Sequence, residues 1–243
     1  MNCKNVFFAL LLAAGLLGCG KQPQPRHYVI LPDLSASIGR GALKQAFKAI
    51  DELVGSLHRR DRITIIPILG DAQAEASGRI IRFEVPANRQ AYDSDLRGFR
   101  AKLKVSLEAM EAAAVAHPGA KTDILGTIAL ADQEFRSGPD TAKRSLVILS
   151  DLIQEDSEVN FRRDKRLDNP TPAKGFAEQI AKKEGLELRG MPVYIGLLQS
   201  REYADLSRNR RAAIQAFWIA YFKSMNGKPS FATDGPGLLK RHD

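Results

Sequence analysis

Three short oxygen-bearing side chains follow one apolar segment at alternating positions. Asp33, Ser35 and Ser37 come directly after the apolar run 27–32, and each is separated from the next by one apolar residue. In an extended turn, this alternation sends all three side chains to the same side of the backbone. Oxygen ligands of this type suit hard cations. The loop therefore predicts part of a site for Mg²⁺, or for Mn²⁺ or Ca²⁺.

Two further polar residues stand at corresponding places later in the chain. Thr122 precedes the helical run 123–135, and Asp151 follows the apolar run 145–150. A hard cation takes about six ligands, more than one short loop supplies, so ligands must converge from several segments. The candidate metal-binding residues are Asp33, Ser35, Ser37, Thr122 and Asp151.

Apolar runs of strand length alternate with amphipathic runs of helix length. The strand-like runs are 27–32, 63–69, 79–85, 145–150, 192–198 and 230–233. The helical runs are 39–57, 93–116, 123–135, 172–184 and 202–224. This alternation predicts an α/β fold with a doubly wound, mostly parallel central sheet flanked by helices. Such sheets bind ligands at the carboxyl ends of their strands, which is where the candidate residues fall.

The ordered set Asp-x-Ser-x-Ser, then Thr, then Asp resembles the metal-ion-dependent adhesion site of von Willebrand factor type A (VWA) domains. The resemblance covers about residues 27–235 and implies a Rossmann-like sheet. It also implies that Ser35, Ser37 and Thr122 contact the ion directly, whereas Asp33 and Asp151 act through water. The segment 122–126 resembles the threonine loop of the family, and 147–151 resembles its fourth strand.

Two residues depart from the family pattern. Leu152 follows the last aspartate, where the family often has glycine, and it is expected to alter the loop that shapes the ligand face. Lys121 precedes Thr122, where glycine is common. Its charge would weaken metal binding by repulsion or help to bind a carboxylate, unless it is simply a solvated loop charge.

The resemblance implies a binding module rather than an enzyme. Neutral inner ligands leave the ion most of its charge, so a carboxylate of a partner protein or envelope ligand would complete its coordination. One alternative is a Mg²⁺-dependent phosphoryl hydrolase with Asp33 as nucleophile, but Ser35 stands where such hydrolases need an acidic residue. Another alternative is an envelope scaffold that has lost the metal site. The four histidines are scattered without metal-ligand spacing, so no catalytic residue is assigned.

The N-terminus resembles that of a bacterial lipoprotein. Lys4 precedes an apolar run, 6–17, which is shorter than the roughly 20 residues of a membrane-spanning helix. The run ends in Leu-Leu-Gly-Cys, which is similar to a lipobox. We therefore expect a signal peptide over 1–18, a tether over 19–26 that carries lipid such as palmitate on Cys19, and a VWA-like domain over 27–243. Gly20 replaces the aspartate associated with inner-membrane retention, which favours the outer membrane.

The chain is basic, with a formal net charge of +8. On a lipoprotein, anionic headgroups or envelope polymers are simpler partners than nucleic acid, which is not expected, and solubility alone is an equal explanation. Basic residues cluster at Arg162–Arg166 and at Arg208–Arg211, where a solvated face is the default expectation. The aromatic residues of the last helical run are expected in the core: Phe217, Trp218, Tyr221 and Phe222.

Overall fold

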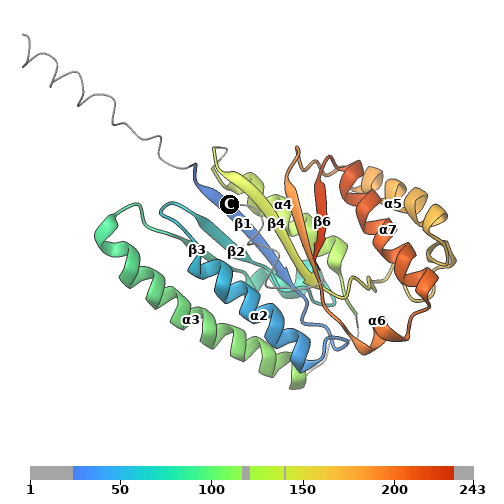
Figure 1. The fold of residues 1–243 in the computed structure, drawn as a ribbon, viewed down its shortest axis with the longest axis horizontal. Helices are drawn as coiled ribbons and strands as arrows, with labels where there is room; N and C mark the ends of the chain where they lie inside the picture. Colours follow the sequence, from blue (N-terminus) through green and yellow to red (C-terminus); the bar gives the residue numbers. More distant parts are fainter. Residues whose placement is uncertain (1–23, 117–120, 140, 233–243) are drawn as a thin grey trace, which may run out of the picture.

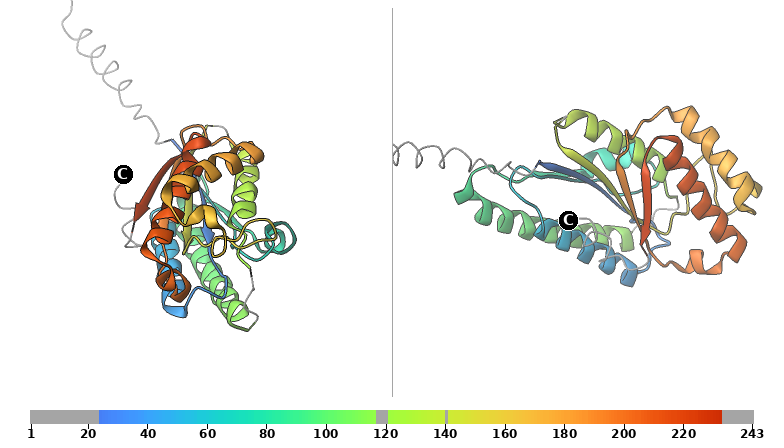
Figure 2. Two further views of the ribbon diagram at one scale, coloured as in Figure 1. Left: turned by 90° about the vertical axis from the view of Figure 1, so that its right-hand side faces the viewer. Right: turned by 45° about the horizontal axis from the view of Figure 1, so that its top comes forward.

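The computed structural model describes residues 24–116, 121–139 and 141–232, which form a six-stranded sheet with helices on both faces (Figures 1 and 2). The expected signal peptide and Cys19 lie outside these residues. The strands are β1 (Arg26–Pro32), β2 (Arg62–Ile65), β3 (Ile81–Glu84), β4 (Lys143–Ser150), β5 (Pro192–Leu197) and β6 (Lys228–Ala232). Within the described residues, no helix combines the length and apolarity needed to cross a bilayer.

The sheet has the order β3-β2-β1-β4-β5-β6. All neighbouring strands are parallel except β2 and β3, which pair antiparallel at one edge. β1 lies between β2 and β4, and the strand order reverses there. On one side of β1 the sheet continues through β2 to β3, and on the other side it continues through β4 and β5 to β6. The prediction of a doubly wound, mostly parallel sheet is therefore confirmed, and its switch point lies at the carboxyl end of β1.

The main helices are α2 (Arg40–Gly55), α3 (Arg89–Ala116), α4 (Ile124–Ser137), α5 (Pro170–Glu184), α6 (Arg201–Asp205) and α7 (Arg208–Ser224). Helix α3 packs on α2, and α5 packs extensively on α7 (Figure 1). Crossovers between parallel strands are right-handed, so connections that run in opposite directions lie on opposite faces. α2 connects β1 to β2, whereas α5 and α7 connect β4 to β5 and β5 to β6, so α5 and α7 lie on the face opposite α2.

The prediction of one continuous helix over residues 202–224 is wrong. The structure divides it into α6 and α7 at Leu206 and Ser207. Leu206 has an extended backbone, with φ −69° and ψ 145°, and the Ser207 hydroxyl accepts a hydrogen bond from the Arg210 backbone at 3.2 Å. Ser207 is thus the N-cap of α7, and a capping serine begins a new helix because it satisfies a backbone N–H that lacks a helical partner.

The aromatic cluster of α7 lies in the core, as predicted. Phe217, Trp218, Tyr221 and Phe222 each have 0% exposure. The Trp218 ring packs edge-on against Tyr221 at 5.5 Å between centroids, and its Nε1–H donates to the Leu152 carbonyl at 3.0 Å. α7 is therefore fixed to the loop that follows β4, on which Asp151 lies.

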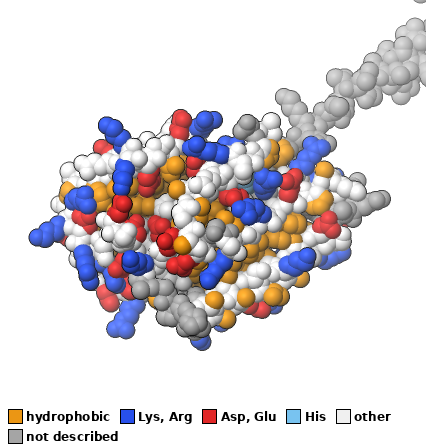
Figure 3. Space-filling model, turned by 180° about the vertical axis from the view of Figure 1, so that it is seen from behind, with side chains coloured by type: hydrophobic (Ala, Val, Ile, Leu, Met, Phe, Trp, Pro, Cys, Tyr) orange, Lys and Arg blue, Asp and Glu red, His pale blue; other side chains and the backbone are white. Residues whose placement is uncertain are grey.

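The charges of the surface are mixed where the molecule is seen from behind. In Figure 3, Lys and Arg side chains are interspersed with Asp and Glu. One expected solvated arginine is instead structural: the Arg210 guanidinium donates to the Phe161 and Asp164 carbonyls at 3.1 Å each and pairs with Asp168. Arg210 therefore ties the start of α7 to the charged loop after β4.

One buried histidine makes stability depend on acid. His27 on β1 is 1% exposed, and burial, followed by the positive charges of Arg62 and Arg144, lowers its pKa from 6.5 to about 4. Between pH 6.5 and 4, His27 is protonated in the unfolded chain but stays neutral in the folded chain. The free energy of unfolding therefore falls as the pH drops from 6.5 to 4.

We expect the free energy of unfolding of the wild type, relative to His27→Gln, to fall by about 2 to 3 kcal/mol between pH 7.5 and 4. Urea unfolding over this pH range measures it. The difference between the two proteins should be constant from pH 7.5 to 9, and a constant difference down to pH 4 would refute the assignment to His27.

Candidate functional site

Asp33 lies at the switch point of the sheet and is fully buried. Its backbone N–H donates to the Leu149 carbonyl of β4 at 2.8 Å, and it forms a parallel bridge with Ile68, which continues β2. Its carboxylate accepts hydrogen bonds from the Ser35 backbone at 2.9 Å and from the Ser150 hydroxyl at 2.5 Å. Asp33 is thereby held rigidly between the ends of two neighbouring strands.

A chain of hydroxyls leads from this loop to the last aspartate. The Ser35 and Ser37 hydroxyl oxygens are 3.1 Å apart, and the Ser37 hydroxyl donates to Asp151 Oδ2 at 3.0 Å. The other oxygen of Asp151 accepts the Ile153 backbone N–H at 3.0 Å. Residues 114 positions apart in the sequence thus meet in one hydrogen-bonded network at the carboxyl ends of β1 and β4.

Thr122 lies at the same end of the sheet, on a neighbouring loop. Its backbone exchanges two hydrogen bonds with Glu155, at 2.9 and 2.8 Å, and the next residue, Asp123, donates to the Leu69 carbonyl at 2.8 Å. Leu69 follows Ile68, the bridge partner of Asp33, so the threonine loop flanks the β2 side of the switch point. Thr122 is 7% exposed, and among the described residues no hydrogen bond joins its hydroxyl to the other four candidates.

The two buried aspartates bring more negative charge together than the described side chains neutralise. Burial, followed by the nearby charge of Asp151, raises the pKa of Asp33 to about 7, although hydrogen bonds from Ser150 and Ser35 oppose the shift. Burial also raises the pKa of Asp151, against hydrogen bonds from Ser200, Ile153 and Ser37. Burial thus favours the neutral form of both carboxyl groups, whereas a bound cation would favour their ionised form.

Three polar residues that support the site were not assigned from the sequence. Ser150 donates to Asp33, the Ser200 hydroxyl lowers the pKa of Asp151, and the Gln154 amide oxygen accepts the Ile124 and Leu125 backbone N–H groups at 2.7 and 3.1 Å. Ser200 lies beyond the carboxyl end of β5, so the rule that ligand sites lie after parallel strands could have found it. Gln154 fixes the start of α4 and carried no sequence signal.

Leu152 departs from the family pattern at a position with a special backbone. Its φ is +67°, a left-handed value that glycine adopts without the steric cost borne by other residues. Its side chain is nevertheless fully buried, and its carbonyl accepts the hydrogen bond from Trp218. Packing and this hydrogen bond therefore hold Leu152 in a left-handed backbone conformation that glycine adopts more readily.

Charged residues near the site have distinct roles. Asp123 caps α4, accepting the Gly126 N–H at 2.8 Å, which agrees with its expected place at a helix N-terminus. Lys121 is exposed. Arg162 pairs with Glu202 at 2.7 Å and with Glu155 at 3.4 Å, and so joins α6 to the part of the loop after β4 that bridges to Thr122. These residues shape the rim around the candidate site.

The donor set fits a hard cation only if hydroxyl oxygens are ligands. Within the described residues, no group of three or more His, Cys, Asp or Glu side chains could hold a metal ion. The candidate site instead offers two buried carboxylates and the hydroxyls of Ser35 and Ser37, with Thr122 on the adjacent loop. This chemistry suits Mg²⁺ or Mn²⁺, which need few charged protein ligands when water fills other positions.

Similarity to known proteins is found in structure and not in sequence. No family profile and no curated protein match the sequence. The pilus adhesin SpaC of Lactobacillus rhamnosus GG matches with a TM-score of 0.50 and 11% identity, over 89% of this chain and 29% of that chain. A von Willebrand factor type A protein of Catenulispora acidiphila matches with a TM-score of 0.48 and 15% identity, over 89% of this chain and 41% of that one. The manganese-loaded TRAP protein of Plasmodium vivax gives a TM-score of 0.43 and 12% identity, over 88% and 71%.

At such low sequence identities, the similarity shows the fold alone. The chain spans less than half the length of SpaC and of the Catenulispora protein. The fold is defined independently by the sheet order, the single antiparallel edge strand and helices on both faces. The chain therefore has the fold of a von Willebrand factor type A domain.

Proposed function

We propose that the chain is a membrane-anchored binding module whose divalent metal ion engages an acidic group of a partner. Ser35, Ser37 and Thr122 would contact the ion directly, and Asp33 and Asp151 would hold it through water. The observation that carries the proposal is the hydrogen bond from Ser37 to Asp151, which joins the two segments at the switch point.

A bound Mg²⁺ or Mn²⁺ would supply a positive charge that attracts a carboxylate from a partner protein or envelope ligand. The chain's own residues prepare the place for it. Ser150 and the Ser35 backbone orient Asp33, and the Ile153 backbone and the Ser37 hydroxyl orient Asp151. Since both carboxylates are already positioned by donors, little reorganisation accompanies ion binding.

The burial of Asp33 speaks against the phosphoryl hydrolase. A nucleophilic aspartate must reach the phosphorus atom of a substrate, whereas Asp33 is 0% exposed and both its oxygens accept hydrogen bonds. Ser35, two residues on, cannot act as the general acid. The binding module is therefore the favoured function, and no phosphate release from p-nitrophenyl phosphate is expected.

Membrane attachment belongs to the proposal through Cys19. The described fold begins at Gln24, five residues after this cysteine. Acylation of Cys19 would place the domain close to a bilayer, with the outer membrane favoured by Gly20. Metabolic labelling with palmitate, lost in Cys19→Ser, tests this part alone.

The proposed binding is tested by capture of envelope proteins on the immobilised chain. We expect Mg²⁺ to increase capture at least tenfold over EDTA, because the ion supplies the attraction. Ser37→Ala should remove this increase, whereas Ser224→Ala, an exposed serine at the far end of α7, should leave it unchanged. Amidation of carboxyl groups in the extract should abolish capture. Equal capture with Mg²⁺ and EDTA would favour the scaffold.

A further inference from the structure

One face of the sheet carries a cavity of about 860 Å³ at the amino ends of β1, β4 and β5. Tyr28 pairs with Ser145 in register, and both line the cavity together with Tyr194 of β5. His27 packs on Phe135 of α4, so the next residue, Tyr28, points to the opposite face of the sheet, which is the face of α2. α5 and α7 lie on the other face and therefore do not cover the cavity. Ser230 of β6, which pairs with Tyr194, is accordingly exposed.

The cavity is strongly basic. Besides His58, its lining holds one carboxylate, Asp61, and the cations Arg26, Arg59, Lys143, Arg144 and Arg189. Asp61 is 1% exposed and is already neutralised by Arg26, whose guanidinium donates to it at 2.8 and 3.0 Å. The remaining cations therefore give the cavity a net positive charge.

Several of these cations are available to an outside anion. Arg59 and Lys143 are exposed, and neither forms an ion pair with any residue in the described ranges. Arg189 has a side chain that is 78% exposed and lies 3.8 Å from the exposed Glu187, a separation and setting that contribute little energy. The cations come from different segments around one opening, which suits a surface of many phosphate groups better than one enclosed anion.

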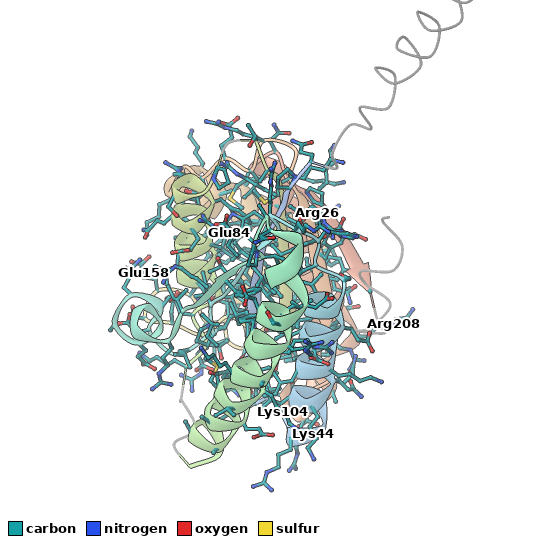
Figure 4. The ribbon with its side chains drawn as sticks, turned by 90° about the vertical axis from the view of Figure 1, so that its left-hand side faces the viewer. Arg26, Lys44, Glu84, Lys104, Glu158 and Arg208 are labelled. Carbon is teal, nitrogen blue, oxygen red and sulfur yellow. The ribbon has the colours of Figure 1, made fainter. Side chains whose placement is uncertain are left out.

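The cavity faces the end of the molecule from which the tether leaves. Gln24, the first described residue, lines it, and Arg26 begins β1. Cys19 is five residues before Gln24 and thus within roughly 18 Å of it even when the tether is fully extended. The candidate metal site follows the seven residues of β1, about 20 Å away at the opposite end. In Figure 4, Arg26 lies at the end of the molecule opposite Lys44 and Lys104.

We propose that this cavity binds the phosphate-bearing headgroups of anionic phospholipids and so holds the domain against its membrane with the metal site facing away. The inference rests on the proposed lipid anchor, since the anchor keeps the cavity near headgroups. Each Lys or Arg close to an anionic bilayer strengthens binding about fivefold, so a few cations add substantially to a single acyl anchor.

The test uses a water-soluble chain that begins at Gly20, which retains every described contact because the described fold begins at Gln24. Its binding to phosphatidylglycerol vesicles is measured by sedimentation in EDTA at low salt. Neither the anchor nor the metal site enters this readout, so its failure is distinct from a failure of the proposed function. The variant is Arg59→Gln with Lys143→Gln, and the control is Lys44→Gln with Lys104→Gln, which removes the same charge at the other end.

We expect the cavity variant to bind vesicles at least tenfold more weakly than the wild type, and the control to change binding less than threefold. Vesicles of phosphatidylcholine should bind neither protein. An equal loss in both variants would overturn the proposal, because net charge alone would then explain binding. Saturable binding of inorganic phosphate or glycerol phosphate at concentrations below those of vesicle lipid would also overturn it, in favour of a site for a soluble anion.

Discussion

Adding Mg²⁺ or Mn²⁺ to the wild-type protein should raise its unfolding midpoint by roughly 5 to 10 °C. A ligand that binds only the folded state at 100 times its dissociation constant stabilises it by about 2.7 kcal/mol, and each kcal/mol moves the midpoint of a domain of this size by about 2 to 4 °C. The increase should disappear in Ser35→Ala and in Ser37→Ala, because each removes a proposed ligand. Differential scanning fluorimetry with the metal ions and with EDTA measures both effects.

Ser224→Ala is the matched control, because this exposed serine lies at the C-terminal end of α7, and it should respond to metal as the wild type does. In EDTA both site variants should unfold somewhat below the metal-free wild type, because they lose the hydrogen bonds that join Ser35, Ser37 and Asp151, so the effect of metal is measured for each variant against its own midpoint in EDTA. A metal-induced increase that survives in both site variants would place the ion elsewhere in the molecule.

Trp218→Ala should lower the free energy of unfolding by about 3 to 5 kcal/mol. Trp218 is fully buried among Phe161, Phe217 and Tyr221, so truncation leaves a large cavity and removes the hydrogen bond to the Leu152 carbonyl. Guanidinium unfolding of the metal-free protein measures the loss.

Trp218→Phe separates packing from the hydrogen bond. It keeps most of the apolar ring but leaves the Leu152 carbonyl without its indole donor, so it should cost about 1 to 3 kcal/mol. Because Leu152 is adjacent to Asp151 and is held at a positive φ, this variant should also weaken metal-induced stabilisation. A cost for Trp218→Ala below 1 kcal/mol would contradict the role of α7 as a fixed part of the core.

The sequence predicted the sheet well because buried parallel strands are apolar on both faces. The runs that became β1, β4 and β5 stand out for this reason, and the polar residues directly after β1 and β4 do converge at one end. The alternation of Asp33, Ser35 and Ser37 likewise produced one connected network. The local sequence pattern was therefore sufficient to predict the position of residues that neighbouring parallel strands hold in place.

Other features depend on contacts that are distant in the sequence and left no local signal. The break at Ser207 is different, because its capping hydrogen bond from Arg210 is local; the run keeps its helical spacing across the break, so the apolar pattern does not reveal it. Arg210 has the sequence context of a solvated charge, but the loop after β4 places four acceptors around its guanidinium. Gln154 orients the threonine loop across 30 residues. Thr122 likewise lies beside β2 because Asp123 hydrogen-bonds Leu69, a contact that no local sequence pattern indicates.

The most direct test of the central claim is a crystal structure of the protein grown with Mn²⁺, measured for anomalous scattering. We expect one anomalous peak at the carboxyl ends of β1 and β4, within direct coordination distance of the Ser35, Ser37 and Thr122 hydroxyls, with one coordination position open to solvent or filled by a carboxylate. A fully occupied Mn²⁺ elsewhere, or a Thr122 hydroxyl turned away from Ser35 and Ser37 at saturating Mn²⁺, would contradict a metal-dependent binding site.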